Sequence, residues 1–532
     1  MKARTAGIMV PLFSVPSEAS WGIGEIPDIA RVARWCASAG CNLIQLLPVT
    51  EMPFGETSPY SSLSAMAIDP QFIALREVPE FDAIGGEGAL VSEEREHLEQ
   101  VRKASTVDYA TVRTLKNDVL RRCFERFRTH ALGANTARAH AFRAWTTAES
   151  WWLDDYALFR ALHHLHPERE WSDWPSGLAD RQPSALADAR EQLGHEITYR
   201  QYLQWLAGEQ WARAREACGP VRLFGDLPFM VSRHSADVWA RQNEFRMDVS
   251  VGAPPDAFSE TGQDWKLPLY RWDVVEAGGF AWIKERGRRY ATLFDGYRID
   301  HLVGFFRTYY QSYDGQPPGF SPAEEPEQIA LGEHVLEAFA SMGSDLIAED
   351  LGVIPGFVRE TLARLQVPGL KVFRWEREWQ LEGQPFIDPR DYPERSAATS
   401  GTHDTEPMTL WWESASVEER EAVLSVPFIA ERLPGQARAE LAAKPRLTRS
   451  VWAAIVEALF AAGSTTLIFP IHDVFEWRER INTPATVGPH NWTWRLPWPA
   501  ERFDSDADAE RVASTLSGWS ERYGRGLRPT RR

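Results

Sequence analysis

Short apolar runs recur along the chain and are separated by segments in which apolar residues follow a helical spacing. Eight of these runs are rich in Val, Ile, Leu or Phe and are mostly bounded by Gly, Pro or Asp, as is typical of buried parallel strands. The runs are Gly7–Pro11, Asn42–Leu47, Val221–Gly225, Gly296–Ile299, Asp345–Ala348, Leu370–Arg374, Ser396–Thr402 and Thr465–Phe469. Eight strands that alternate with helices predict an α/β fold, a closed (β/α)8 TIM barrel. A doubly wound open sheet is the alternative.

Two connections in this pattern are too long for simple crossovers. Residues 71–220 are predicted to form a mostly helical insertion after the second strand. Residues 227–293 are predicted to form a lid-like insertion, rich in Pro and Trp, followed by a helix between the third and fourth strands. Long ordered loops at a barrel mouth are usually functional. We therefore expect one interrupted barrel over residues 1–532, with no separate C-terminal β domain.

Charge and cysteine usage narrow the class of protein. The formal net charge of −17 argues against binding to a phosphate backbone, so nucleic acid is not an expected partner. The four cysteines form no CxxC pair, which is typical of reduced thiols in the cytoplasm. The longest apolar stretch, Val451–Ile471, is interrupted by Glu457 and Gly463, so no membrane span is expected. Some of the 23 tryptophans are candidates for stacking on sugar rings, because indole faces pack well on apolar surfaces.

Three of the predicted strands lead into an acid. These acids are Asp300, Glu349 and Asp404, and each is followed by a segment that we expect to be helical. An acid at the carboxyl end of a barrel strand faces the mouth of the barrel, where such folds carry their chemistry. Any one of these acids alone is better explained as a helix N-cap or a solvated loop residue. Three of them, from three strands, indicate an active site that depends on carboxylates.

The residues next to these acids suggest a role for each acid in the chemistry of the site. Two carboxyl groups held across a glycosidic bond can cleave it, one as nucleophile and the other as general acid and base. Arg298 lies two residues before Asp300, so on a strand it shares a face with that carboxylate and is expected to keep it ionised. Glu349 follows two apolar residues, and we expect a raised pKa and an acid role. Asp404, beside His403, is suited to sugar hydroxyls.

A fourth acid, Asp226, ends the third predicted strand. A structural role at the end of the strand and a contact with sugar are both open for this residue.

Several motifs of the chain resemble those of the amylomaltase family, the 4-α-glucanotransferases or disproportionating enzymes of the α-amylase clan. The resemblance runs from Gly7 to about Pro499 and is weaker in the helical insertion. Its motifs are Thr57-Ser58-Pro59-Tyr60, Gly225-Asp226-Leu227-Pro228, Pro254 to Gln263, Arg298-Ile299-Asp300-His301, Ala348-Glu349-Asp350-Leu351-Gly352, Gly401-Thr402-His403-Asp404, Arg480-Ile481-Asn482 and Asn491 to Leu496.

This resemblance implies transfer of α-1,4-glucan segments between malto-oligosaccharides by a retaining double displacement, without a cofactor or a metal. It implies that Asp300 is the nucleophile, Glu349 the general acid and base, and Asp404 the stabiliser of the transition state. It also implies that Tyr60 stacks on a donor glucose and that the loop from Asp256 to Gln263 arches over the cleft. The candidate substrate-binding residues are Tyr60, Asp226, Arg298, His403, Asp256, Ser259, Gln263 and Trp265.

The chain departs from the family's commoner pattern at Ser61, Lys266, Leu267, Thr405 and Glu406. None of these positions removes a catalytic group, and they bear on acceptor preference and on the outer subsites. The preference for transfer over hydrolysis follows from the resemblance alone, so an α-1,4-glucan hydrolase that uses the same three acids is the first alternative. A Mg²⁺ enzyme with the three acids as ligands and a non-catalytic glucan-binding protein are the others.

Overall fold

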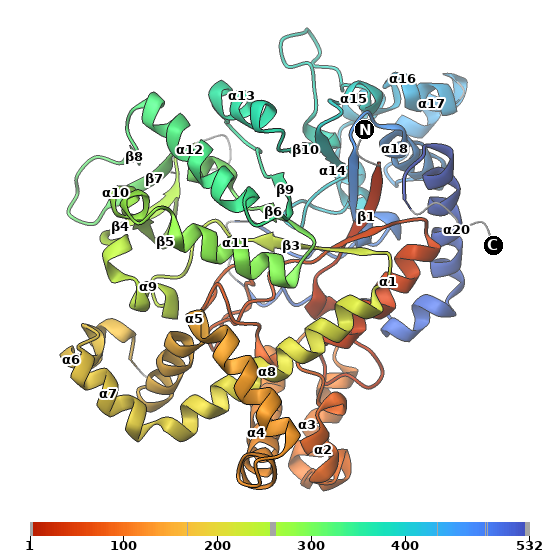
Figure 1. The fold of residues 1–532 in the computed structure, drawn as a ribbon. Coiled ribbons are helices and arrows are strands. Elements are labelled where there is room, and N and C mark those ends of the chain that lie inside the picture. Colours follow the sequence, from red (N-terminus) through yellow and green to blue (C-terminus); the bar gives the residue numbers. More distant parts are fainter. Residues whose placement is uncertain are drawn as a thin grey trace.

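The computed structural model describes residues 4–167, 169–255, 262–433, 435–484, 486 and 488–526 of the 532-residue chain. At its centre, eight parallel strands form a closed barrel in the order β1-β12-β11-β10-β9-β6-β3-β2 (Figure 1). The strands are β1 (Thr5–Met9), β2 (Leu43–Gln45), β3 (Arg222–Leu227), β6 (Gly296–Ile299), β9 (Asp345–Ala348), β10 (Gly369–Val372), β11 (Ser396–Thr399) and β12 (Thr466–Pro470). Each overlaps one of the eight apolar runs. The predicted TIM barrel is therefore confirmed, and the open sheet is excluded.

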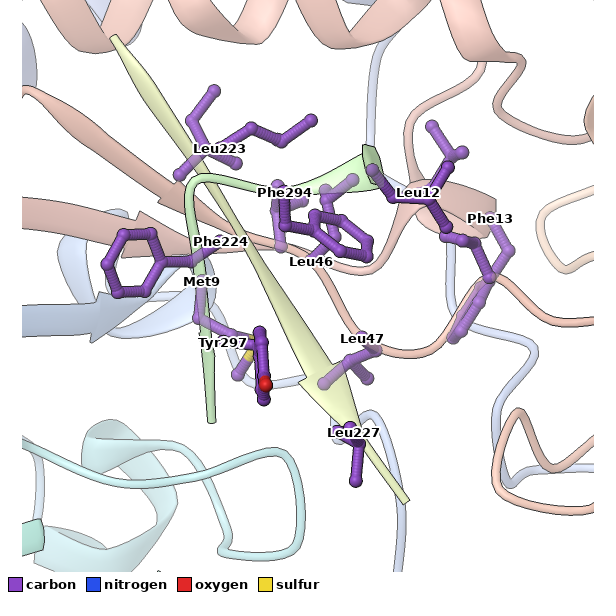
Figure 2. Packing of buried hydrophobic residues seen from close by; sticks show 14 of the residues in the cluster. Met9, Leu12, Phe13, Leu46, Leu47, Leu223, Phe224, Leu227, Phe294 and Tyr297 are labelled. Atoms are coloured by element: carbon purple, nitrogen blue, oxygen red, sulfur yellow. The ribbon is translucent and has the colours of Figure 1, made fainter. Parts of the chain in front are cut away.

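Strands β3 and β6 pair in parallel, and a glycine in each strand makes room for a phenylalanine ring. A Cβ atom on Gly225 would lie 2.6 Å from the ring of Phe294, and one on Gly296 would lie 2.5 Å from the ring of Phe224. Figure 2 shows these two rings among the apolar side chains that pack around β3. The resulting register pairs Asp226 with Arg298. The glycines leave room for the two rings, and the register places two charged residues of neighbouring strands side by side.

Helices cover the barrel and fill the long connection between β2 and β3, where α2 to α8 form the lower lobe in Figure 1. The first eight helices are α1 (Ile29–Ser38), α2 (Pro79–Ala83), α3 (Ser92–Lys103), α4 (Tyr109–Phe127), α5 (Ala137–Leu165), α6 (Ser176–Ala179), α7 (Pro183–Gln192) and α8 (Gly194–Ala217). The others are α9 (Ala236–Ala240), α10 (Trp272–Ala277), α11 (Ala281–Leu293), α12 (Glu325–Ala340), α13 (Gly356–Leu365), α14 (Met408–Ser414), α15 (Val417–Leu424), α16 (Pro427–Arg432), α17 (Gly435–Ala442), α18 (Arg449–Ala461), α19 (Ile471–Val474) and α20 (Ala507–Arg522).

A second, antiparallel sheet lies beside the barrel and was not predicted. Its order is β5-β4-β7-β8, and its strands are β4 (Phe245–Ala253), β5 (Gln263–Tyr270), β7 (Thr308–Ser312) and β8 (Gly319–Ser321). Two of its strands lie in the connection that precedes β6, and two follow Asp300, where a helical segment was expected. That expectation is wrong, because a short 3-10 turn and β7 and β8 come before α12. The signal was present in β4, where Phe245, Met247, Val249 and Val251 alternate with polar residues.

Within the described ranges, none of the helices combines the length and the apolar composition that crossing a membrane requires.

The cysteines Cys36, Cys41, Cys123 and Cys218 are buried free thiols. Burial raises the pKa of Cys41 and Cys123 to about 12, so neither thiol is ionised at neutral pH.

Candidate active site

Arg298 is the centre of a charged cluster at the carboxyl ends of β3, β6 and β9. Its Nε donates to Asp226 Oδ1 at 2.9 Å, its Nη1 to Glu349 Oε2 at 2.9 Å, and its Nη2 to Asp300 Oδ1 at 2.7 Å. The ion pair with Asp300, expected from their spacing on one strand, is therefore present. Arg298 and Asp226 are sealed from solvent, whereas the side chains of Asp300 and Glu349 keep 23% and 20% of their surface exposed.

Asp226 is held entirely inside the protein. One of its oxygens accepts from Arg298 and the other from the Tyr60 hydroxyl at 2.8 Å, and none of the residue is exposed. Of the two roles considered for this acid, the geometry favours the structural one. Asp226 orients the guanidinium and the phenol that face the site, because a buried carboxylate with two strong donors fixes both partners.

The register of the barrel brings Asp300 and Glu349 together. Ile299 of β6 pairs with Ala348 of β9, and the two acids are the next residues of these strands. A hydrogen bond joins their carboxyl groups. His301 has a left-handed backbone, with φ of 42°, and its N–H donates to Glu349 Oε2 at 2.9 Å. The pair therefore lies at the barrel mouth, with both carboxyl groups beside the Arg298 guanidinium.

The pKa shifts of Asp300 and Glu349 differ from the expectation. Burial raises the pKa of Asp300 well above its usual range, and the neighbouring charge of Glu349 adds to the effect. Burial also opposes ionisation of Glu349, but Arg298 and the His301 N–H outweigh it and leave the pKa of Glu349 lowered. The raised pKa predicted for Glu349 is thus wrong for the free protein, and so is the expectation that Arg298 keeps Asp300 ionised. The apolar neighbours of Glu349 in sequence matter less than the donors that reach it from β6.

Asp404 lies on the other side of the site, in a turn beyond the end of β11. Asn482 Nδ2 donates to its Oδ1 at 2.7 Å, and His403 Nε2 lies 3.1 Å from its Oδ2. Arg480 Nη2 donates to its backbone carbonyl at 3.0 Å. Although burial opposes ionisation, His403 and Asn482 lower the pKa of Asp404 to about 2. This acid is ionised at any physiological pH, and 44% of its side-chain surface is exposed.

An aromatic group connects the two sides of the site. The ring of Tyr60 stacks on His403 with centroids 5.2 Å apart, and Trp492 lies 5.6 Å from Tyr60 and 5.5 Å from His403. Arg298 Nη2 donates to the Tyr60 hydroxyl at 3.0 Å. Tyr60 is thus anchored to the acid cluster through its hydroxyl and to His403 through its ring.

Two more of the predicted contact residues, Gln263 and Trp265, lie on strand β5 of the antiparallel sheet. Trp265 packs edge-on against His301 at 4.8 Å, and its Nε1 donates to Gln263 Oε1 at 3.0 Å. Trp265 thereby contacts the residue that donates to Glu349. The predicted residues Asp256 and Ser259 lie outside the described residues.

Two residues of the site were missed by the sequence analysis, although both stand in motifs that it named. Asn482 supplies the amide that holds Asp404, and Trp492 supplies the third aromatic ring. From the sequence alone, Asn482 and Trp492 look like ordinary core residues. Their role becomes visible only in the structure, where the segment that contains them packs against the mouth of the barrel.

The geometry also bears on the metal alternative. Arg298 donates to Asp300 and Glu349, two of the three acids in that alternative, so a guanidinium already lies between them where a cation would be needed. Within the part of the chain that the structure describes, no group of three or more His, Cys, Asp or Glu residues is arranged to hold a metal ion.

Comparison with known proteins identifies the family of the chain. A sequence model of the family described as 4-alpha-glucanotransferase matches residues 10–501. The 4-alpha-glucanotransferase of Chlamydia pneumoniae is 32% identical over 497 residues, which cover 92% of this chain and 91% of the relative. The enzyme of the same name from Thermus thermophilus is 33% identical over 510 residues, covering 93% and 95%.

A solved structure agrees with these relatives. The amylomaltase from Streptococcus agalactiae in complex with acarbose superposes with a TM-score of 0.80 at 26% identity. The match covers 98% of this chain and 100% of that one.

Proposed function

Because the chain belongs to the 4-alpha-glucanotransferase family, we propose that it transfers segments of α-1,4-glucans between malto-oligosaccharides with Asp300, Glu349 and Asp404 as its catalytic acids. Membership makes it an enzyme that transfers glycosyl groups on α-glucans. The observation that carries the assignment of residues is the pair of hydrogen-bonded, partly exposed carboxyl groups held by Arg298 at the barrel mouth.

The proposed reaction is a retaining double displacement. Asp300 attacks the anomeric carbon of the donor while Glu349 protonates the departing glycosidic oxygen, which leaves as the shortened chain. Glu349, now ionised, removes the proton from a hydroxyl of the acceptor. That oxygen attacks the anomeric carbon and displaces Asp300. Asp404, ionised and facing the same space, stabilises the positive charge that develops on the sugar in both steps.

The free site does not yet have the protonation that this reaction needs. Attack requires an ionised Asp300 and a protonated Glu349, and the pKa directions of the free protein are the reverse. The hydrogen bond between the two groups provides a direct route for the proton. In retaining enzymes the two carboxyl groups stand ~5 Å apart, farther than a hydrogen bond allows. We infer that entry of the sugar separates the acids and leaves the proton on Glu349.

Transfer predominates over hydrolysis when the site positions an acceptor hydroxyl next to the glycosyl-enzyme and excludes water. The segment of residues 227–293 is our candidate for this lid, because β5 places Trp265 against His301 directly beside Glu349. Gln263 is the first residue of β5. The sugar face is proposed to consist of Tyr60 and His403, with Arg298 and Asp226 behind them.

The compartment that we propose is the cytoplasm, because the four cysteines are free thiols of the kind that a reducing compartment preserves.

Incubation of the pure protein with maltotriose tests the function. Disproportionation releases glucose and builds maltopentaose and longer chains, while the total of reducing ends stays constant. A rising number of reducing ends with only shorter products would make the protein a hydrolase. An unchanged maltotriose solution would overturn the proposal.

A further inference from the structure

Trp492 has a backbone conformation that large residues rarely adopt. Its φ of 64° lies in the left-handed region, where a bulky side chain is strained. Such strain persists only where the surrounding structure holds it, and it is concentrated at functional sites. Trp492 is 7% exposed and His403, on which it packs, is 5% exposed, so burial alone does not separate the roles of the two residues. What the residue does must therefore be sought in its neighbours.

The indole of Trp492 packs on both rings of the proposed sugar face. Its centroid lies 5.6 Å from that of Tyr60 and 5.5 Å from that of His403. Tyr60 is further held by Asp226 and Arg298, and His403 lies against Asp404. A ring that touches both partners limits how far either can tilt, because packed side chains transmit even small displacements.

The backbone of Trp492 is held from two directions. Its carbonyl accepts from the hydroxyl of Tyr109, the first residue of α4, at 2.7 Å. Its N–H donates to the carbonyl of Ile481 at 2.8 Å, and the residue after Ile481 is Asn482, which binds Asp404. One segment thus supports the aromatic side of the site and the carboxylate side, and it is tied to the helices between β2 and β3.

We propose that Trp492 is a positioning residue for the transfer reaction: its ring, held in a left-handed backbone by Tyr109, sets Tyr60 and His403 in place against the sugar. This inference rests on the proposed function, since it gives those two rings their role. It also gives the helical connection a task, because α4 supplies the hydroxyl that fixes the Trp492 carbonyl.

Two substitutions of Trp492 separate the ring from the backbone. Glycine accepts a positive φ but has no ring, whereas phenylalanine keeps an aromatic ring. We expect Trp492→Gly to lower kcat/KM with maltotriose by about 10- to 100-fold, since a small misplacement of binding groups has effects of this size. We expect Trp492→Phe to recover most of that loss. Trp494→Phe is the matched control. Trp494 is equally buried in the same segment but packs on Trp477, so its substitution is expected to leave kcat/KM unchanged.

A double-mutant cycle with Tyr60→Ala distinguishes positioning from a general structural effect. If Trp492 acts partly through Tyr60, Trp492→Gly costs clearly less in the Tyr60→Ala background than in the wild type, because groups in contact are not additive. Tyr109→Phe, which keeps the ring of α4 and removes only its hydroxyl, is expected to lower kcat/KM in the same direction by a smaller factor. This variant covers the case in which Trp492→Gly fails to fold.

Acarbose binding by calorimetry is measured on the same proteins, so that the inference does not depend on turnover. Weaker binding in Trp492→Gly, with recovery in Trp492→Phe, supports it. Equal losses in both Tyr60 backgrounds, or wild-type binding and rates in folded Trp492→Gly and Tyr109→Phe, would overturn it. If the wild type binds acarbose but does not disproportionate maltotriose, the proposed function fails and the binding cycle still decides on Trp492. A wild type with neither property would overturn both.

Discussion

Two buried clusters of charged residues in this protein differ in their ratio of cations to acids and in their exposure to solvent. The cluster around Arg298 joins one cation to three acids, and Asp300 and Glu349 reach solvent. The second cluster lies between the N-terminal segment and α4. There Lys116 and Arg76 face Glu25 and Asp28, and the side chains of Lys116 and both acids are almost fully buried.

The balance of charge explains the contrast. Lys116 Nζ donates to Glu25 Oε1 and to the carbonyls of Gln71 and Ile73, so all three of its hydrogen atoms are used. Lys116 thus ties Glu25 to the segment of Gln71 and Ile73 and has no hydrogen atom left for another partner. The Arg298 cluster has an excess of acids, and burial together with the charge of Glu349 raises the pKa of Asp300. An excess of one charge type together with partial exposure is therefore the feature that marks chemistry here.

The sharpest test of the contrast removes an acid from the reactive cluster. Asp300→Asn and Glu349→Gln are each expected to lower kcat by three orders of magnitude or more, a loss of ~4 kcal/mol in transition-state stabilisation. Because burial raises the pKa of Asp300, its ionised form is unfavourable in the folded state, and the free energy it contributes is lost as the pH rises. Asp300→Asn should therefore be at least as stable as the wild type at pH 7. Maltotriose kinetics and thermal unfolding measure both effects, and near-wild-type rates would refute the site.

The opposite result is expected for the balanced cluster. Lys116→Met leaves Glu25 paired with Arg76 alone among the residues that the structure describes, and it leaves two buried carbonyls without the Lys116 donor. Breaking a buried pair in this way costs about 3–5 kcal/mol of unfolding free energy. Turnover per folded molecule should stay near the wild-type value. Denaturant unfolding measures the loss of stability, and activity at low denaturant measures the turnover per folded molecule. A variant that is stable but inactive would contradict the contrast.

Asp28 provides a pH test within the balanced cluster. Burial, followed by the charge of Glu25, raises its pKa to about 7 from an unfolded value near 4. The folded protein thus binds a proton more tightly than the unfolded chain, and stability falls as the pH rises from about 4 to about 7. The difference in unfolding free energy between wild type and Asp28→Asn should shift against the wild type across this window, by at most about 4 kcal/mol. A constant difference from pH 4 to pH 8 would show that Asp28 titrates normally.

The smallest effect is expected where a charge pair is exposed. Lys103 and Glu99 form an i,i+4 pair on α3 in which both side chains are mostly exposed. Lys103→Ala should change the unfolding free energy by less than about 0.5 kcal/mol and leave the rate unaltered. It serves as the baseline for the Lys116 variant, and a loss comparable to that of Lys116→Met would remove the distinction between buried and exposed pairs.

Much of this arrangement was predictable, because it depends on local patterns. The eight strands are short apolar runs between breakers, and Asp300 and Glu349 follow directly from the ends of two of them. The antiparallel sheet was overlooked although β4 alternates, since two of its strands come after Asp300, where the barrel pattern suggests a helix. The protonation of Glu349 could not be predicted, because its donors reach it from another strand. Neither could Trp492, whose role depends on Tyr60, His403 and Tyr109, all far away in sequence.

The central claim is that Asp300 forms a covalent bond to the donor sugar while Glu349 transfers the proton. Glu349→Gln incubated with an α-maltotriosyl fluoride tests it most directly, because fluoride departs without the help of an acid while the second step still lacks its base. Mass spectrometry of the digested protein is predicted to show one maltotriosyl unit on the peptide that contains Asp300. A sugar attached to another acid, or rapid turnover of the fluoride without any attached sugar, would contradict the claim.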